Sequence, residues 1–167
     1  MTDSLTPRLA LPLLAAGQAQ KELSHNEALS RIDLTLHGNI MGNNAEVPPD
    51  DPEPGQCWII GETPEGDWAG HAGEIAGWTD GGWRFVRPCE GMQLWSGLDT
   101  GFAIFSGDEW RLGEAHGRLF VAGEQVIGPR SAAIAEPAGG AVVDAEARAT
   151  ILAVLNAMRA HGLVEAD

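Results

Sequence analysis

Side chains that often carry out chemistry occur in this chain, but their spacing predicts no catalytic centre. None of the five histidines lies in a G-x-S-x-G or similar nucleophile motif. The close Cys/His spacing and the H-E-x-x-H pattern of zinc sites do not occur either. No Walker or dinucleotide-type glycine loop opens a helix. We therefore predict a protein that is not an enzyme and that has no cofactor, no metal and no catalytic residues.

Carboxylates and thiols give weaker signals. The two carboxylates of a glycoside hydrolase can lie far apart in a chain, so the sequence leaves this alternative open without supporting it. Cys57 and Cys89 are the only cysteines. They form no metal-ligand pattern, and we expect both to be buried free thiols.

Six tryptophans lie in or beside a region rich in short strands, in a chain without tyrosine. Most are expected to fill a small core. Trp68 and Trp110 are flanked by polar turn residues, which favours exposure. An exposed indole could stack on a sugar ring. This gives an alternative function, a carbohydrate-binding module that contacts capsular or surface polysaccharide.

Charge and hydropathy limit the partners. The chain has 167 residues, with 24 acidic and ten basic ones and a net charge of −14. A nucleic-acid surface needs a basic patch, so nucleic acid is not an expected partner. No apolar run approaches the roughly 20 residues that span a bilayer. The run LALPLLAA is short and interrupted by Pro12, which predicts no signal peptide, synthesis in the cytoplasm and no membrane insertion.

The N-terminal part, residues 1–45, is expected to form an arm followed by a helix. Two prolines in residues 1–16 predict an extended arm with an apolar tip. Ser24 and Glu27 form a capping box, which predicts a helix from about His25. Its apolar stripe is Ala28, Leu29, Ile32 and Leu36. This short helix needs a partner, either its own β domain or a symmetry mate in a homo-oligomer.

The remaining chain predicts a mainly β protein with flanking helices. Residues 46–55 read as a proline- and acid-rich linker. Residues 56–130 contain seven short apolar segments separated by turns, typical of a small antiparallel β sandwich or open barrel. Residues 131–167 form a linker and a C-terminal helix. Asp144 is its N-cap, and its apolar face contains Ala147, Ile151, Val154, Leu155 and Met158.

Four segments resemble a known family. They are RLALPLLAAGQAQKELSHNEAL, PGQCWIIG, GDWAGHAGEIAGWTDGGWRFVRPCEGM and VVDAEARATILAVLNAMRAHGLV. They are similar to a domain-of-unknown-function family of structural proteins from alphaproteobacterial prophages and gene transfer agents, which is associated with tail fibres and head spikes. The resemblance implies a non-enzymatic component of a phage-like particle, located in the extracellular virion. Its expected role is a head-spike or tail-fibre base or adaptor that supports host attachment.

The same resemblance implies partners. We expect a homo-oligomer, trimer or pentamer, bound to other capsid, spike or fibre subunits. Host surface polysaccharide is a further candidate partner. From residue type, the predicted attachment and oligomer interface consists of Leu9, Leu11, Leu13, Leu14, Gln18, Gln20, Lys21, His25, Asn26, Glu27, Leu29 and Ile32.

Overall fold

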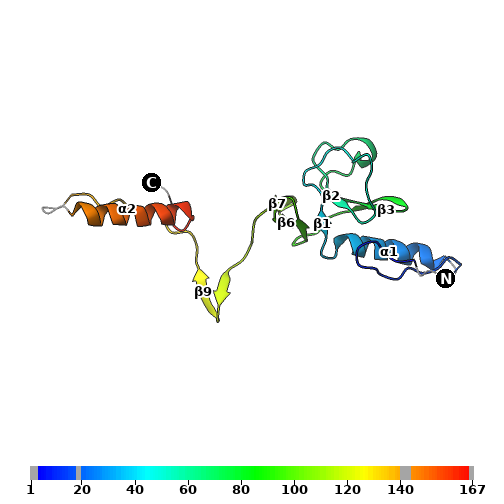
Figure 1. The fold of residues 1–167 in the computed structure, drawn as a ribbon, viewed down its shortest axis with the longest axis horizontal. Coiled ribbons are helices and arrows are strands. Elements are labelled where there is room, and N and C mark those ends of the chain that lie inside the picture. The colour runs from blue at the N-terminus through cyan, green and yellow to red at the C-terminus, as the bar shows by residue number, and fades with distance from the viewer. Residues whose placement is uncertain (1–3, 18–19, 140–143, 166–167) are drawn as a thin grey trace. The chain divides into compact units, whose positions relative to one another are not determined.

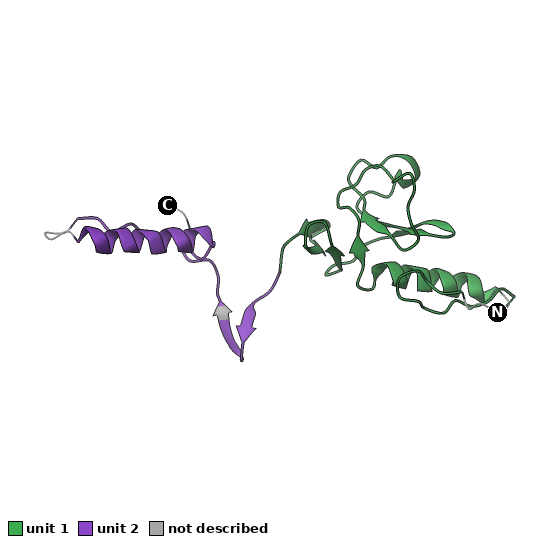
Figure 2. Cartoon of the chain, viewed as in Figure 1, with its two compact units in different colours: residues 1–115 green, residues 116–167 purple. Residues whose placement is uncertain are grey.

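The computed structural model describes residues 4–17, 20–139 and 144–165. The chain divides into two compact units, Met1–Ala115 and His116–Asp167 (Figure 2). The boundary falls inside the range 56–130 that the sequence assigned to one β domain. Each unit is described separately below.

The first unit contains helix α1, Lys21–Thr35, and a seven-stranded sheet (Figure 1). The strand order is β4-β3-β2-β1-β5-β6-β7, with β1 parallel to both neighbours and the other pairs antiparallel. The strands are β1 Asn39–Ile40, β2 Cys57–Ile59, β3 Ile75–Thr79, β4 Gly82–Val86, β5 Gln93–Ser96, β6 Gly101–Ser106 and β7 Glu109–Leu112. The mainly β class with an N-terminal and a C-terminal helix is confirmed.

The sheet is curved, so that the edge strand β7 approaches the start of β3. The indole Nε1 of Trp110 on β7 donates a hydrogen bond to the carbonyl of Gly73, just before β3, at 3.0 Å. Residues from both halves of the sheet consequently share a core with α1. Its buried members are Leu34, Ile40, Cys57, Ile59, Ile75, Leu94 and Ala103. Gly77 of β3 has no side chain, and Leu34 of α1 fills the space where a Cβ atom would lie. The glycine therefore lets the helix approach β3 closely.

The opposite face of β2–β4 carries a second, tryptophan-rich core. Trp58, Ile60, Trp68 and Ala76 are buried there, with Trp83 and Phe85 packed against them. Trp68 enters from the short 3₁₀ helix η1, Gly66–Trp68, in the loop between β2 and β3. This loop closes over a sheet face that would otherwise expose apolar side chains to water.

The second unit contains a hairpin and a helix. Strands β8, Leu119–Val121, and β9, Glu124–Ile127, pair only with each other among the described residues. Helix α2, Ala145–Ala160, begins at Asp144, whose carboxylate accepts a hydrogen bond from the Ala147 amide at 2.8 Å. The predicted N-cap is thus confirmed. Neither helix in the described part of the chain combines the length and apolar composition needed to cross a bilayer.

Three local predictions were wrong. Helix α1 begins at Lys21 rather than about His25, and its N-cap Gln20 makes no side-chain capping bond, so Ser24 lies inside the helix. The segment 118–127, the last of the seven apolar segments and predicted as a single strand, forms two strands, because Ala122 and Gly123 both adopt positive φ and reverse the chain. Cys57 is buried as expected, but Cys89 is exposed because it lies in the loop between β4 and β5.

Candidate functional site

The N-terminal arm is folded back on α1 rather than extended. A turn over residues 7–9 lets Thr6, Arg8 and Leu9 all reach the carboxylate of Asp33. The Thr6 hydroxyl and the Leu9 amide donate to Oδ1 at 2.7 and 2.6 Å, and the Arg8 amide donates to Oδ2 at 3.1 Å. We call this group the arm clasp. Asp33 is completely enclosed, so the clasp replaces its hydration shell.

Arg8 also completes the C-terminus of α1. Its guanidinium donates to the carbonyls of Asp33, Leu34 and His37. The last carbonyls of a helix have no partner within the helix and carry partial negative charge. The arm therefore supplies both a polar anchor for α1 and a cationic cap for its end.

Two predicted interface residues are engaged within their own chain. The side-chain amide of Asn26 accepts from the Leu14 amide and donates to the Leu14 carbonyl, at 2.9 and 3.0 Å. Glu27 pairs with Arg31 at 2.8 Å and with Arg84 of β4 at 2.7 Å. Burial raises the pKa of Glu27, but the hydrogen bonds and positive charges of Arg31 and Arg84 outweigh this effect and hold the pKa below its usual range. Both side chains thus have partners within their own chain, and their place in an oligomer interface stays a prediction.

The apolar stripe of α1 points away from its own domain. Asp33 and Leu34 are the buried residues of the helix. Ile32 is 45% exposed, and Leu23 and Leu36 are at least as exposed. Polar anchoring to the arm and to Arg84 orients the helix so that much of its apolar side stays exposed.

The other predicted interface residues differ in their exposure. Gln20, Lys21 and His25 are exposed and line a shallow hollow with Ser24 and Ala28. Leu9 is exposed, whereas Leu11, Leu13, Leu14 and Leu29 are half-buried. Gln18 lies outside the described residues.

The prediction that Trp68 is exposed was wrong. It is 0% exposed and packs against Trp58 and Trp83, with ring centroids 6.0 and 5.2 Å away. The polar residues around it belong to the loop that carries the indole inward, so local composition was misleading. Trp68 is therefore a core residue of the β domain.

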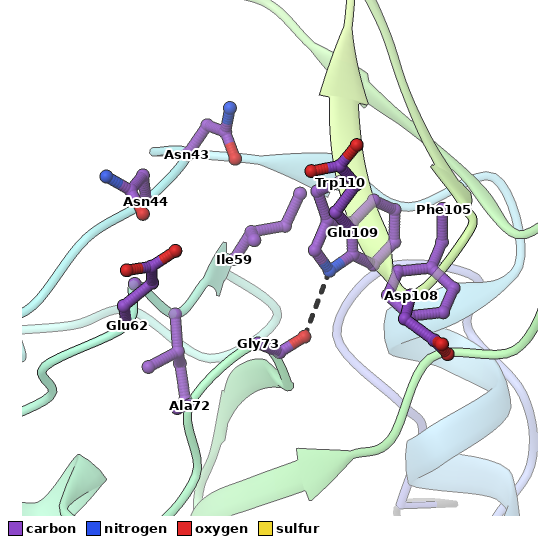
Figure 3. A pocket seen from close by; sticks show the side chains of 12 residues that line it. Asn43, Asn44, Ile59, Glu62, Ala72, Gly73, Phe105, Asp108, Glu109 and Trp110 are labelled. Atoms are coloured by element: carbon purple, nitrogen blue, oxygen red, sulfur yellow. Dashed lines mark hydrogen bonds between the residues drawn. The ribbon is translucent and has the colours of Figure 1, made fainter.

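Trp110 is half-buried and lines a polar cleft of about 630 Å³ (Figure 3). The cleft lies between the loop after β1, the ends of the β2–β3 loop and the β6–β7 turn. Its polar side chains are Asn43, Asn44, Glu62, Asp108 and Glu109. Phe105 stands edge-on to the Trp110 ring, with centroids 5.3 Å apart.

The lining of this cleft defines what it can bind. Its carboxylates and amides are hydrogen-bonding partners for hydroxyl groups, and Trp110 and Phe105 provide apolar surface. Glu109 is paired with Arg111 at 2.7 Å, which partly neutralises it. In the described part of the chain, no three His, Cys, Asp or Glu side chains gather as a metal site would require. The cleft thus combines hydrogen-bonding side chains with aromatic surface.

An exposed aromatic pair lies on the outer face of β5 and β6. Trp95 and Phe102 are directly opposite in register, with ring centroids 5.0 Å apart. They are 37% and 51% exposed, whereas Leu94 and Ala103 point into the core. The alternation of buried and exposed residues in these strands was the sequence signal that would have identified this pair.

The C-terminal unit exposes most of its large apolar side chains. They are Leu119, Phe120, Val121, Ile127, Ile134, Ile151, Val154 and Leu163. Among its described side chains, only Leu155 and Val164 are fully buried.

Taken together, these features define a mainly β protein with exposed apolar surfaces and a polar cleft. Residues 25–111, more than half of the chain, match a family model described as a protein of unknown function (DUF2793). The chain belongs to this DUF2793 family. Comparison with curated proteins finds no significant match.

Proposed function

We propose that this chain is a non-enzymatic structural subunit of a phage-like particle, which assembles with copies of itself and with other particle proteins. The observation that carries the proposal is the exposed apolar surface of the C-terminal unit. An isolated two-stranded hairpin and a single helix are marginally stable in water. Two buried apolar side chains give this unit little core of its own. Assembly would cover the remaining apolar surface.

The particle role follows from the sequence resemblance together with this need for partners. In a head-spike or tail-fibre base, one part of each subunit is enclosed by neighbours and another is displayed. The β domain has two cores of its own and suits the displayed part. The proposed task is to support host adhesion, directly or by carrying another fibre, in an extracellular particle.

The mass of the purified full chain in solution tests self-assembly. Light scattering should give one discrete oligomer, a trimer or a pentamer, because exposed apolar surface favours association. Circular dichroism of the same sample checks that α2 is formed. A stable monomer with an intact C-terminal helix would contradict self-assembly. Attachment to the particle is measured separately, by co-sedimentation of the chain with purified particles.

A second candidate function is carbohydrate binding, and the outward aromatic pair favours it. Trp95 and Phe102 offer ring surface on an open sheet face. The amide of Gln93 and the guanidinium of Arg111 share that face by strand register. Trp110 in the polar cleft offers a more enclosed indole. Such surfaces suit the apolar face and the hydroxyl groups of a sugar.

Titration of the protein with host surface polysaccharide tests this candidate. If the outer face binds the polysaccharide, Trp95→Ala should weaken binding by about two- to twelvefold, since an aromatic contact contributes about 0.5–1.5 kcal/mol. Leu98→Ala is the matched control, because Leu98 is exposed and apolar but offers no ring. If Trp110→Ala weakens binding and Trp95→Ala does not, the polysaccharide binds in the cleft. Equal affinity of wild type and both tryptophan variants would contradict the candidate.

A further inference from the structure

Helix α2 has two apolar sides, and only one of them is buried by the described residues of its own unit. Leu155 is buried and Leu152 is half-buried, on the side that faces residues 130–139. Arg159 anchors this side, donating to the Ile134 carbonyl at 3.1 Å and pairing with Glu136. The position of the helix against its own chain is therefore fixed by this side.

The other side presents a second apolar stripe to solvent. Ile151 and Val154 are 47% and 54% exposed. Ala147 and Met158 extend the stripe at spacings of four, three and four residues. This spacing is the a/d pattern of helices that pack side by side over about two turns or more. We call these four residues the α2 seam.

The side chains beside the seam are mostly small. Thr150, Ala153 and Ala157 lie along one flank, and Glu146 is the charged residue at the N-terminal end of this flank. Small side chains let another helix approach closely. The seam therefore fits a narrow apolar partner, such as another helix.

The distribution of charge favours a second copy of the chain as that partner. Residues 1–115 contain six Lys/Arg and 18 Asp/Glu, a formal charge of −12. Residues 116–167 contain four Lys/Arg and six Asp/Glu, a formal charge of −2. Copies that meet through the first unit would repel strongly, whereas copies that meet through the second would repel little.

We propose that copies of this chain associate through the α2 seam, with Ile151 and Val154 of each copy packed against the same residues of its neighbours. The proposal rests on the self-assembly part of the proposed function and names the surface that performs it. It moves the main oligomer contact from the predicted arm and first helix to the C-terminal helix. In a closed symmetric oligomer, identical seams from each copy meet around one axis.

Disulfide trapping in the full chain tests the seam directly. The background carries Cys89→Ser, because Cys89 is exposed. Cys57 can stay, since it is enclosed and burial raises its pKa to about 11. In this background, Val154→Cys should form an intermolecular disulfide under mild oxidation. Ala149→Cys, exposed on another side of α2, is the matched control and should remain monomeric on a denaturing gel.

Light scattering on two aspartate variants gives the complementary result. Ile151→Asp should reduce the oligomer to monomer, while Ile32→Asp on α1 should leave its mass unchanged. Both positions are exposed, so the fold of each subunit should persist, as tryptophan fluorescence and circular dichroism would verify. If Ile151→Asp still forms the oligomer and Val154→Cys forms no intermolecular disulfide, the proposal that copies meet through the α2 seam is wrong, but self-assembly itself still stands. A monomeric wild type would overturn both.

Discussion

Replacing Asp33 by alanine is expected to lower the free energy of unfolding of the first unit by about 3 kcal/mol or more. Asp33 is 1% exposed and accepts three hydrogen bonds from the arm. Without the carboxylate, the Thr6 hydroxyl and two backbone amides lose their acceptor in a site closed to water. Each buried donor left without a partner costs about 1–3 kcal/mol, although the arm can open and recover part of this.

Urea denaturation followed by tryptophan fluorescence measures the effect, because all six tryptophans lie in residues 58–110. Asp51→Asn, in an exposed part of the linker, is the control for loss of one negative charge and should change stability little. Thr6→Val removes one donor and should cost less than Asp33→Ala. In the double variant the two effects should be less than additive, since both remove the same contact. Unchanged stability of Asp33→Ala would show that the clasp contributes nothing.

Trp68→Ala is expected to destabilise the β domain by about 3–5 kcal/mol, the usual cost of removing a buried large aromatic side chain. Trp68 is the largest fully buried side chain of the described residues. Its ring packs against both Trp58 and Trp83, so its loss would leave a cavity on one face of the β2–β4 sheet. The β2–β3 loop, which contains η1, would lose its aromatic anchor in this core.

Thermal and urea unfolding of Trp68→Ala should be compared with those of Trp95→Ala. Both variants remove an indole. Because Trp95 is on the outer face, its replacement should lower the free energy of unfolding by about 1 kcal/mol. Trp68→Phe should recover part of the lost stability, because the phenyl ring fills some of the cavity. This variant also removes the indole N–H of Trp68, which has no hydrogen-bond partner in the described structure. Equal stability of the two alanine variants would contradict the assignment of Trp68 to the core.

These two sites bear on how the chain could function in an assembly. The clasp keeps the arm on α1, so the arm is part of the first unit rather than a free attachment segment. The tryptophan core is the second buried apolar cluster of the β domain. Among the described residues, exposed large apolar side chains are found on the outer side of α1, on β5 and β6, and above all in the second unit.

The sequence by itself determined most of the local structure. The short apolar segments between glycine-rich turns predicted six of the seven strands of the main sheet, because strand and turn propensities act over a few residues. Asp144 predicted the start of α2 for the same reason. The two-residue strand β1 was missed, since it is too short to show any period and is defined only by its neighbours on both sides.

Only the tertiary structure decided which sides of these elements are buried. The apolar stripe predicted on α1 is largely exposed, because Asp33 is held by Thr6, 27 residues away in the chain, and Glu27 is held by Arg84, 57 residues away. Trp68 is buried because a loop folds over the sheet, and α2 buries Leu155 while leaving Ile151 and Val154 in solvent. Periodicity defines a face, but the contact that fixes its orientation lies far along the chain, where no local pattern indicates it.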